Sequence, residues 1–211
     1  MPLLHLDSSG DLTGSRSRAI SATFADAWRA GGGEVVHRDL HRDPPPHLPD
    51  PALHWPAAMR PDATPPAAAE ALQRELVEEL LAADALLVAS PLYNWTVPST
   101  LKAWIDHIHV PGVTTHNPEV PGPLHGRPAV VVVSRGATYD PGTPTEHDDH
   151  AVAVLRRLLG GSLGMTVEVI TVSRTLAGFV PLLDGEQERA AQELAAAHAA
   201  ARELGEKLVR A

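Results

Sequence analysis

Ser90-Pro91-Leu92-Tyr93-Asn94-Trp95 is the stretch around which the rest of the chain is organised. It follows the apolar residues 85–89 and precedes residues 101–106, which have helical spacing. A short apolar run before a helix is typical of a buried strand, so the stretch is predicted to be the loop at a strand's carboxyl end. In an open α/β sheet, ligands bind outside these ends. Two aromatics, a proline and an amide suit a flat polar heterocycle, while the alternative is an ordinary turn whose aromatics close the end of the sheet.

Outward from this loop, strands and helices alternate along the chain. Strands are predicted at residues 3–7, 34–38, 85–90, 129–133 and 166–173. Helices are predicted from residue 17 to the glycines at 31–33, at 67–83, from Pro98 onward, at 146–159 and at 184–210. The unbroken apolar run at 129–133 favours a central parallel strand. Five strands, each followed by a helix, predict an α/β fold: a doubly wound, five-stranded parallel sheet with helices on both faces.

Two irregular segments interrupt this alternation. Residues 41–66 contain nine of the chain's prolines, so this segment can form neither a helix nor a central strand. Long loops of this kind are lids, partner contacts or disordered segments. Because Leu53, Trp55 and Met59 are apolar, we expect the segment to be covered rather than free. Residues 110–126, rich in proline and glycine, are also predicted to be irregular.

Bulk composition narrows the class of protein. A length of 211 residues without an internal repeat predicts one domain, residues 1–211. A net charge of -9, without a cluster of Lys and Arg, argues against nucleic acid or an anionic membrane as partner. The absence of cysteine excludes disulfides and a thiol nucleophile. Residues 1–7 lack a secretion signal and no apolar run reaches membrane-spanning length, so we expect a cytoplasmic protein.

Residues 8–17 (SSGDLTGSRS) form a polar loop that leads into the first predicted helix. The free amides at a helix start favour an anion, and the hydroxyls add neutral donors, so a phosphomonoester suits this loop. The loop matches neither the Gly-Lys-Ser/Thr pattern of nucleotide triphosphatases nor Gly-x-Gly-x-x-Gly. Alternatively, Ser15 or Ser17 is a plain helix N-cap, and Arg16 and Arg18 are solvated.

The loops after the first, third and fourth strands are all polar and contain serine, glycine or both. In a doubly wound sheet these loops can converge at one edge. Convergence would make residues 134–137 (SRGA) neighbours of residues 8–17 and 90–95. The combination of the three loops is therefore a stronger indication of a binding site than any one of them.

In this order, Ser9, residues 15–17, residues 91–95 with Pro98-x-x-Leu101-Lys102-x-x-x-Asp106, and residues 134–137 resemble one known family. It is the FMN-dependent NAD(P)H azoreductase and quinone reductase family, which belongs to the flavodoxin-like superfamily. The resemblance covers nearly the whole chain and implies a flavodoxin-like fold. It also implies FMN as cofactor, NADH or NADPH as electron donor, and a homodimer with its sites at the interface.

Carried over position by position, the resemblance implies two groups of FMN-binding residues. The phosphate would be held by Ser9, Ser15, Arg16 and Ser17. The isoalloxazine would be bound by Pro91, Leu92, Tyr93, Asn94, Trp95, Ser134, Arg135, Gly136 and Ala137. Trp95 and Tyr139 are candidates for the substrate pocket, although Tyr139 could equally be a surface tyrosine. No catalytic side chain and no metal are expected, because the flavin carries the chemistry.

Three positions depart from the family's pattern. Residue 16 is Arg where Gln is common, and Ala137 replaces the usual second glycine. Residues 113–119 lack the expected aromatics and are shortened. Since this last loop would border the substrate, the resemblance implies the cofactor more directly than the electron acceptor.

Three other patterns have simpler explanations. Residues 160–164 match the Gly-x-Ser-x-Gly hydrolase elbow, but a helix precedes and a strand follows, the reverse of the order the elbow needs. His147 and His150 lack a third metal-binding partner and are predicted to lie on solvated helix faces. Lys102 and Asp106, one helical turn apart, are predicted to cover surface.

The resulting hypothesis is a flavin reductase that works by alternate (ping-pong) half-reactions. NAD(P)H would deliver a hydride to FMN, and a quinone, azo compound or other small electron-poor aromatic would then take the electrons at the same face. One alternative is a flavodoxin-type electron carrier or FMN-binding regulator. Another is a family member that reduces one specific biosynthetic intermediate. The aromatic loops and the long segment 41–66 favour an enzyme over a carrier, which needs an exposed flavin rim and little pocket.

Overall fold

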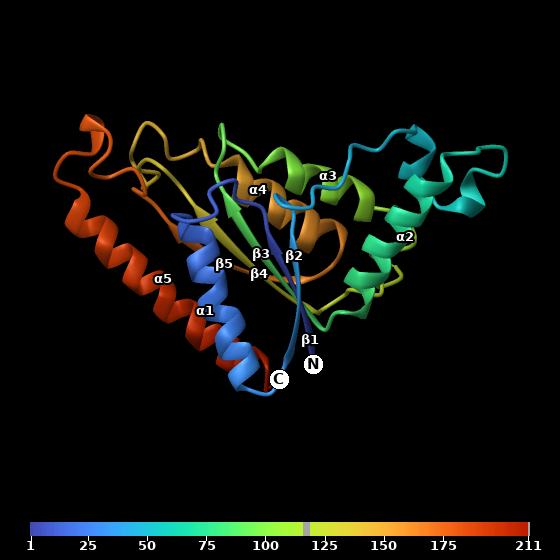
Figure 1. Ribbon diagram of the computed structural model, residues 1–211, viewed down its shortest axis with the longest axis horizontal. Coiled ribbons are helices and arrows are strands. Elements are labelled where there is room, and N and C mark those ends of the chain that lie inside the picture. Colours follow the sequence, from blue (N-terminus) through green and yellow to red (C-terminus); the bar gives the residue numbers. More distant parts are fainter. Residues whose placement is uncertain (116–118, 211) are drawn as a thin grey trace.

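The computed structural model describes residues 1–115 and 119–210. Its five strands form one parallel sheet in the order β2-β1-β3-β4-β5 (Figure 1). The strands are β1 Pro2–Asp7, β2 Glu34–Asp39, β3 Ala85–Pro91, β4 Pro128–Ser134 and β5 Thr166–Val172. The predicted doubly wound parallel sheet is confirmed, and each strand begins and ends within one or two residues of its predicted limits.

Helices cover both faces of this sheet (Figure 1). They are α1 Arg16–Ala30, α2 Ala67–Ala82, α3 Ser99–Ile108, α4 His150–Leu155 and α5 Gln187–Leu208. One apolar cluster joins α1 and α5 to the sheet, with Phe24, Trp28 and Ala201 at its centre. The other joins α2, α3 and α4 to the opposite face, around Leu76, Trp104 and Leu155.

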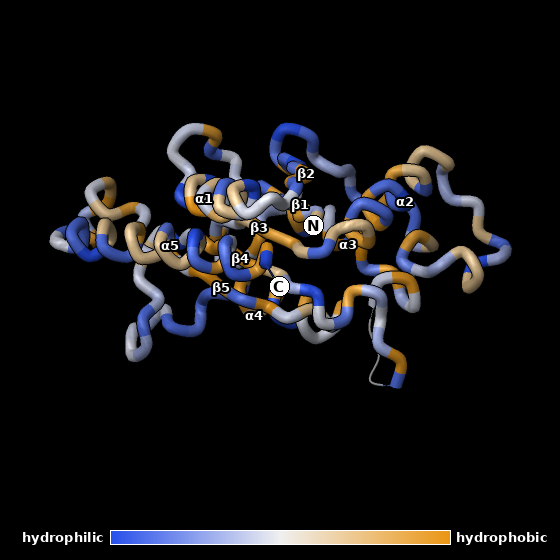
Figure 2. The backbone as a smooth tube through the Cα atoms, turned by 90° about the horizontal axis from the view of Figure 1, so that it is seen from below, coloured by the Kyte–Doolittle hydropathy of each residue, from blue (hydrophilic) through white to orange (hydrophobic). Residues whose placement is uncertain are grey.

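The two central strands are the most buried elements of the fold. All seven residues of β3 are buried, and so are all of β4 after Pro128. Figure 2 shows β3 as a continuous hydrophobic segment between the helices. The edge strand β2 has no buried residue. Apolar side chains on both faces of β3 and β4 therefore fix these strands at the centre, because only a central strand is covered on both sides.

Helix α4 begins later than the sequence pattern predicts. Residues 146–149 lie before it, and Asp149 caps its first turn by accepting a hydrogen bond at Oδ1 from the amide of Val152, at 3.0 Å. The helix then widens into π-helical turns at Arg156–Ser162 before β5 begins. The predicted helix at 146–159 is therefore shifted toward the carboxyl terminus, because the carboxylate of Asp149 supplies the cap.

The proline-rich segment forms two short 3₁₀ turns, Pro51–His54 and Ala57–Met59, and no helix or strand of the sheet, as predicted. Leu53 is fully buried. The expectation that Trp55 and Met59 would also be covered is wrong, since these side chains are 49% and 63% exposed. A single 3₁₀ turn places only one residue in three on its inner face, so the others point outward.

Among the described residues, no helix combines the length and the apolar character that a bilayer crossing requires.

Candidate functional site

The loops that follow β1, β3, β4 and β5 meet at one edge of the sheet. They surround a cavity of about 430 Å³. Its lining consists of Ser9, Asp11, Gly14, Ser15, Arg16, Pro91, Tyr93, Ser134, Thr175, Leu176 and Phe179. Six residues predicted to bind a cofactor therefore line one cavity, although they lie far apart in the sequence. The parallel register explains this, because it pairs Pro91 with Ser134, and Ser134 with Val172, at the ends of three neighbouring strands.

The first loop is folded by the carboxylate of Asp11. Its Oδ1 accepts hydrogen bonds from the amides of Thr13, at 3.0 Å, and Gly14, at 2.8 Å. These two hydrogen bonds lower the pKa of Asp11. A side chain at position 14 would meet Asp11, since a Cβ there would lie 2.8 Å from Oδ2. The loop can therefore approach a ligand with its backbone.

Ser15 caps α1, as the simpler of the two sequence interpretations predicts. Its Oγ accepts a hydrogen bond from the amide of Arg18 at 3.3 Å, and lies 3.2 Å from the Oγ of Ser17. Ser17 is fully buried and is absent from the cavity lining, whereas Arg16 is exposed at the cavity. Capping does not exclude ligand binding, because the first-turn amides of a helix have no acceptor within it.

Arg18 lies behind this loop and is not solvated. Its Nε and Nη2 donate hydrogen bonds to the carbonyl oxygen of Ser9, at 3.2 and 2.7 Å. Its Nη1 and Nη2 donate to the carboxylate of Asp39, both at 2.8 Å, and Nη1 lies 3.3 Å from Asp7. The suggestion that Arg18 is a solvated surface side chain is therefore wrong. Sequence pattern gives no sign of its carboxylate partners, which come from two strands.

Asp7 connects Arg18 to two histidines. Its Oδ2 lies 2.9 Å from Nε2 of His37, and its Oδ1 lies 3.5 Å from Nε2 of His5. Burial alone would raise the pKa of Asp7, but the contacts with His37 and His5 and the charge of Arg18 outweigh it, so this pKa lies well below its usual range. The three groups are close enough to be potential metal ligands. In this structure the guanidinium of Arg18 is the cation beside Asp7.

The loop after β3 is joined to the first loop through Tyr93. Its hydroxyl accepts a hydrogen bond from the amide of Gly10 at 3.3 Å and lies 3.4 Å from Oγ of Ser9. Tyr93 and Thr96 exchange two backbone hydrogen bonds, at 3.0 and 3.1 Å, around a tight turn. Asn94 and Trp95 form that turn with φ of 48° and 67°. Both values lie in the left-handed region, a backbone conformation that residues other than glycine adopt uncommonly.

The loop after β4 contributes Ser134 to the cavity, but the side chain of Arg135 turns away. Arg135 donates hydrogen bonds to Ser173 at 3.0 Å and Asp149 at 3.1 Å. Its guanidinium also lies 5.2 Å from the ring centroid of Tyr139. Burial raises the pKa of Tyr139, and Asp149 adds to this effect. Arg135 and Tyr139 therefore support the loop from outside the cavity lining.

Sequence reasoning missed the part of the lining that follows β5, namely Thr175, Leu176 and Phe179. A signal was available, because these residues directly follow a strand and therefore lie at the same edge of the sheet. The segment 173–178 (SRTLAG) also contains a serine, an arginine and a glycine, as the loop at 134–137 does. The predicted substrate loop, residues 113–119, falls partly outside the described residues.

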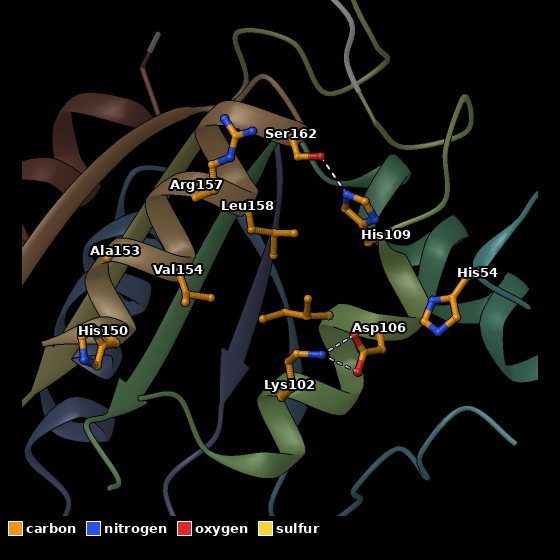
Figure 3. A pocket seen from close by; sticks show the side chains of 11 residues that line it. His54, Lys102, Asp106, His109, His150, Ala153, Val154, Arg157, Leu158 and Ser162 are labelled. Atoms are coloured by element: carbon orange, nitrogen blue, oxygen red, sulfur yellow. Dashed lines mark hydrogen bonds and ion pairs between the residues drawn. The ribbon is translucent and has the colours of Figure 1, made fainter. Parts of the chain in front are cut away.

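A larger groove, of about 650 Å³, lies between α3 and α4 (Figure 3). Its floor is apolar, with Ile105, Val154 and Leu158, and its rim carries the ion pair of Lys102 with Asp106 at 2.5 Å. At one end of the groove, Oγ of Ser162 lies 2.7 Å from Nε2 of His109, and this contact joins the two walls (Figure 3). Ser162 ends a helical segment and precedes a strand, so the residues that match a hydrolase elbow do not form one.

Comparison with known proteins identifies relatives over the full length of the chain. A family model described as "Flavodoxin-like fold" matches residues 1–204. An FMN-dependent NADH:quinone oxidoreductase of Kineococcus radiotolerans is 61% identical over 209 residues, which are 98% of this chain and 99% of that protein. Another protein of the same name, from Frankia alni, is 42% identical and covers 92% of this chain and 95% of its own length.

Solved structures agree on the fold. An azoreductase from Bacillus anthracis superimposes with a TM-score of 0.81 at 20% identity, covering 98% of this chain and 99% of its own. An FMN-dependent NADH-azoreductase from the same species, determined in complex with FMN, gives a TM-score of 0.78 at 18% identity and covers 99% of both chains. At these identities, the likeness establishes the architecture only.

Proposed function

The chain belongs to the flavodoxin-like family of FMN-dependent NADH:quinone oxidoreductases, and from this premise we propose that it uses FMN and NADH or NADPH to reduce quinones, azo compounds or related electron-poor aromatics. The single observation that supports this proposal best is the cavity where four loops meet at the strand ends. It combines a helix start, hydroxyl groups and one exposed arginine at one end with an aromatic side chain and a polar turn at the other. A phosphate and a flat heterocycle need this combination of groups.

The lining fits the two ends of FMN. We assign the phosphate to Ser9, Ser15 and Arg16, because all three line the cavity and the last two lie at the start of α1, where its amides and dipole favour an anion. Ser17 belongs to this set through its hydroxyl contact with Ser15. The isoalloxazine is assigned to the facing loops, Pro91 to Trp95 and Ser134 to Ala137. Tyr93 already joins the two parts of the site by its contacts with the first loop.

When held by these residues, FMN would supply the chemistry of hydride transfer between nicotinamide and acceptor in alternate half-reactions. The chain's own groups supply position and polarity. Hydrogen bonds from the amide of Leu92 to Ser134 and from that of Arg135 to Val172 fix the turns at 92–95 and 134–137 before any charge develops. Polar backbone groups of these turns that face the ligand would then require little reorganisation. Trp95, which is 60% exposed, and Tyr139 remain the candidates for contact with the acceptor. No side-chain acid is needed, because solvent can protonate the reduced product.

The groove between α3 and α4 is assigned to a second copy of the chain. Its apolar floor and the exposed Val154 would be covered in a homodimer, and its rim offers charged groups of both signs (Figure 3). In a two-fold symmetric dimer the same patch of each copy contacts the other, so charges of one sign on it must meet charges of the opposite sign. We further propose that residues 1–211 form one FMN-binding domain and that the enzyme works in the cytoplasm, where NADH is available.

The phosphate assignment is tested by a double substitution, Ser15→Ala with Ser17→Ala. FMN affinity of the apoprotein, measured by quenching of flavin fluorescence, is expected to fall at least about tenfold, since two hydroxyl groups of the site are lost. Part of any effect on stability will come from the lost helix cap, which is worth about 1 kcal/mol. Thr23→Ala is the control, because it removes a half-buried hydroxyl of the same helix that contacts Ala19 and His198 and lies outside the cavity lining. Unchanged FMN affinity in the double variant would contradict the assignment.

A further inference from the structure

Arg174 follows β5 and is buried in an unusual way for a charged residue. Its side chain is only 1% exposed, and it is one of the largest fully buried side chains of the described residues. Its φ of 59° lies in the left-handed region, which a residue with a side chain adopts only at a cost. Neither feature is explained by the FMN-binding residues assigned above, since the side chain of Arg174 is absent from the lining of the 430 Å³ cavity.

The guanidinium of Arg174 holds three carboxylates from different segments. It pairs with Asp140 in the loop after β4, with Glu186 before α5 at 2.5 Å, and with Glu193 in α5 at 2.6 Å. Each of its three nitrogens faces a different carboxylate. The planar fork of an arginine can bridge three partners in this way, whereas a lysine presents a single point charge. Arg174 therefore joins two loops and a helix.

The backbone around Arg174 holds the second flavin loop. The amide of Arg174 donates a hydrogen bond to the carbonyl of Ala137 at 3.0 Å. The next two amides, of Thr175 and Leu176, donate to the carbonyls of Arg135 and Gly136 at 3.1 and 3.2 Å. Residues 174–176 thus pair with residues 135–137 beyond the end of the sheet. These three hydrogen bonds fix the turn at residues 134–137, which is assigned to the isoalloxazine.

The same segment forms one wall of the cavity. Thr175, Leu176 and Phe179 line it opposite the first loop. Gly136 packs directly against this wall, because a Cβ there would lie 2.9 Å from Cδ1 of Leu176 and would force that side chain to shift. The position of the wall therefore depends on the position of Arg174, since Thr175 and Leu176 follow it directly.

Removing the guanidinium would leave an excess of negative charge. Of the three carboxylates, Asp140 and Glu193 would still face Arg189, whose guanidinium lies 3.0 Å from Asp140 and 3.5 Å from Glu193. Carboxylates that lose a buried partner repel one another or take up solvent, and their segments move apart. The loop at 137–140 and the start of α5 would be released together.

We propose that Arg174 is a positioning residue for the flavin site, holding residues 134–140 and 174–179 in the arrangement that binds FMN. It acts through the loops and touches neither cofactor nor substrate. The inference rests on the proposed function for its ligand, but the arrangement of the loops can be measured without any ligand.

The test compares Arg174→Met with Arg38→Met in the full-length apoprotein. Arg38 is a matched control, because its side chain is 15% exposed and donates hydrogen bonds to two carboxylates, Glu75 and Glu79, between β2 and α2. FMN affinity is measured by fluorescence quenching, and loop order by hydrogen exchange followed by mass spectrometry. Arg174→Met is expected to weaken FMN binding at least about tenfold, the equivalent of one well-placed hydrogen bond or more, and to speed exchange at residues 134–140 and 174–180.

Arg38→Met is expected to leave FMN affinity within about twofold and to speed exchange around β2 and α2 only, because additivity holds between distant sites. If Arg174→Met fails to fold, Asp140→Asn takes its place. This variant removes one charged partner of Arg174 whose side chain is 28% exposed. It is expected to weaken FMN binding and to speed exchange, each by less than Arg174→Met would. Arg174→Lys should restore part of the affinity.

Wild-type affinity and wild-type exchange in Arg174→Met would overturn the inference, and so would an equal loss of affinity in Arg38→Met. If the wild-type protein itself binds no FMN, the proposed function fails, while the exchange data still decide whether Arg174 orders the two loops.

Discussion

Asp7, which is buried, and Arg18, which is half-buried, are residues on which the loop at residues 8–17 depends for its conformation. The carbonyl of Ser9 receives two hydrogen bonds from Arg18, whose charge is balanced by Asp39 and Asp7. The loop assigned to the phosphate is therefore held from behind by an ion network between α1, β1 and β2. Hydrogen bonds between charged groups in such partly buried places are stronger than those at the surface.

Because of this network, the free energy of unfolding is expected to fall at acidic pH. The folded-state pKa of Asp7 lies below the unfolded value of about 3.9, so its contribution is fully present above about pH 4 and is lost as pH falls toward the folded-state pKa. Asp7→Asn is therefore expected to lower the free energy of unfolding at neutral pH by about 2 kcal/mol and to flatten its fall below pH 4.

Denaturant unfolding over a series of pH values checks this expectation. Asp26→Asn is the control on α1, because the Asp26 side chain is 75% exposed and its ion pair with Arg29 lies in solvent. The account of Asp7 fails if Asp7→Asn keeps the wild-type slope in acid, or if the control changes the slope as strongly.

At the scale of elements, the contact between α1 and α5 depends on one glycine. A Cβ at Gly205 would lie 2.8 Å from the carbonyl oxygen of Phe24 and 3.0 Å from Cβ of Ala27. The two helices therefore approach too closely for any larger residue. This contact holds α5 against the sheet, and the start of α5 in turn carries the carboxylates that pair with Arg174.

Gly205→Val is expected to destabilise the protein by about 1–3 kcal/mol, because the added atoms force the helices apart. Ala199→Val, which places the same side chain on an exposed position of α5, is the matched control and should change stability by less than about 1 kcal/mol. Thermal unfolding of both variants gives the comparison. Equal stability of the two would mean that α1 and α5 are not packed as closely as described.

The elements were predictable from sequence where burial determines the pattern. Both-face burial makes 85–89 and 129–133 apolar throughout, and one-face burial gives α5 its apolar stripe. The number of strands and their alternation with helices follow from these patterns. Element ends were less predictable. Helix α4 begins at a cap supplied by Asp149, and the exposure of Trp55 follows from a 3₁₀ turn. Neither the position of this cap nor the exposure of a side chain in a short turn follows from the spacing of apolar residues.

The site was predictable to a similar degree. Loops with serine and glycine indicated the edge of the sheet where ligands bind, and Ser9, Tyr93 and Ser134 do lie at one cavity. Arg18 and Arg174 were not identifiable, because their roles come from carboxylates that are distant in sequence. Those pairings exist only once the strands are in register.

At the scale of the whole molecule, the groove between α3 and α4 is the surface that we assign to a second copy of the chain. Val154 is 39% exposed above a floor that includes Ile105 and Leu158. If a second copy covers this groove, Val154→Asp should raise the dimer dissociation constant at least about tenfold, since a charge would be buried at the interface without a partner.

Sedimentation velocity over a range of protein concentrations measures this change. Val36→Asp, on the edge strand β2 where the side chain is 45% exposed, is the control. A monomeric wild-type protein, or a dimer that Val154→Asp leaves intact, would contradict the assignment of the groove.

The central claim is that the four loops at the strand ends bind FMN in a form that NADH can reduce. The most direct measurement is the visible absorbance of the purified protein, equilibrated with FMN, freed of excess flavin and titrated with NADH without oxygen. The account predicts a protein-bound yellow flavin that is bleached by NADH and recovers its colour when a quinone is added. A protein that stays colourless after equilibration, or a bound flavin that NADH leaves oxidised, would contradict it.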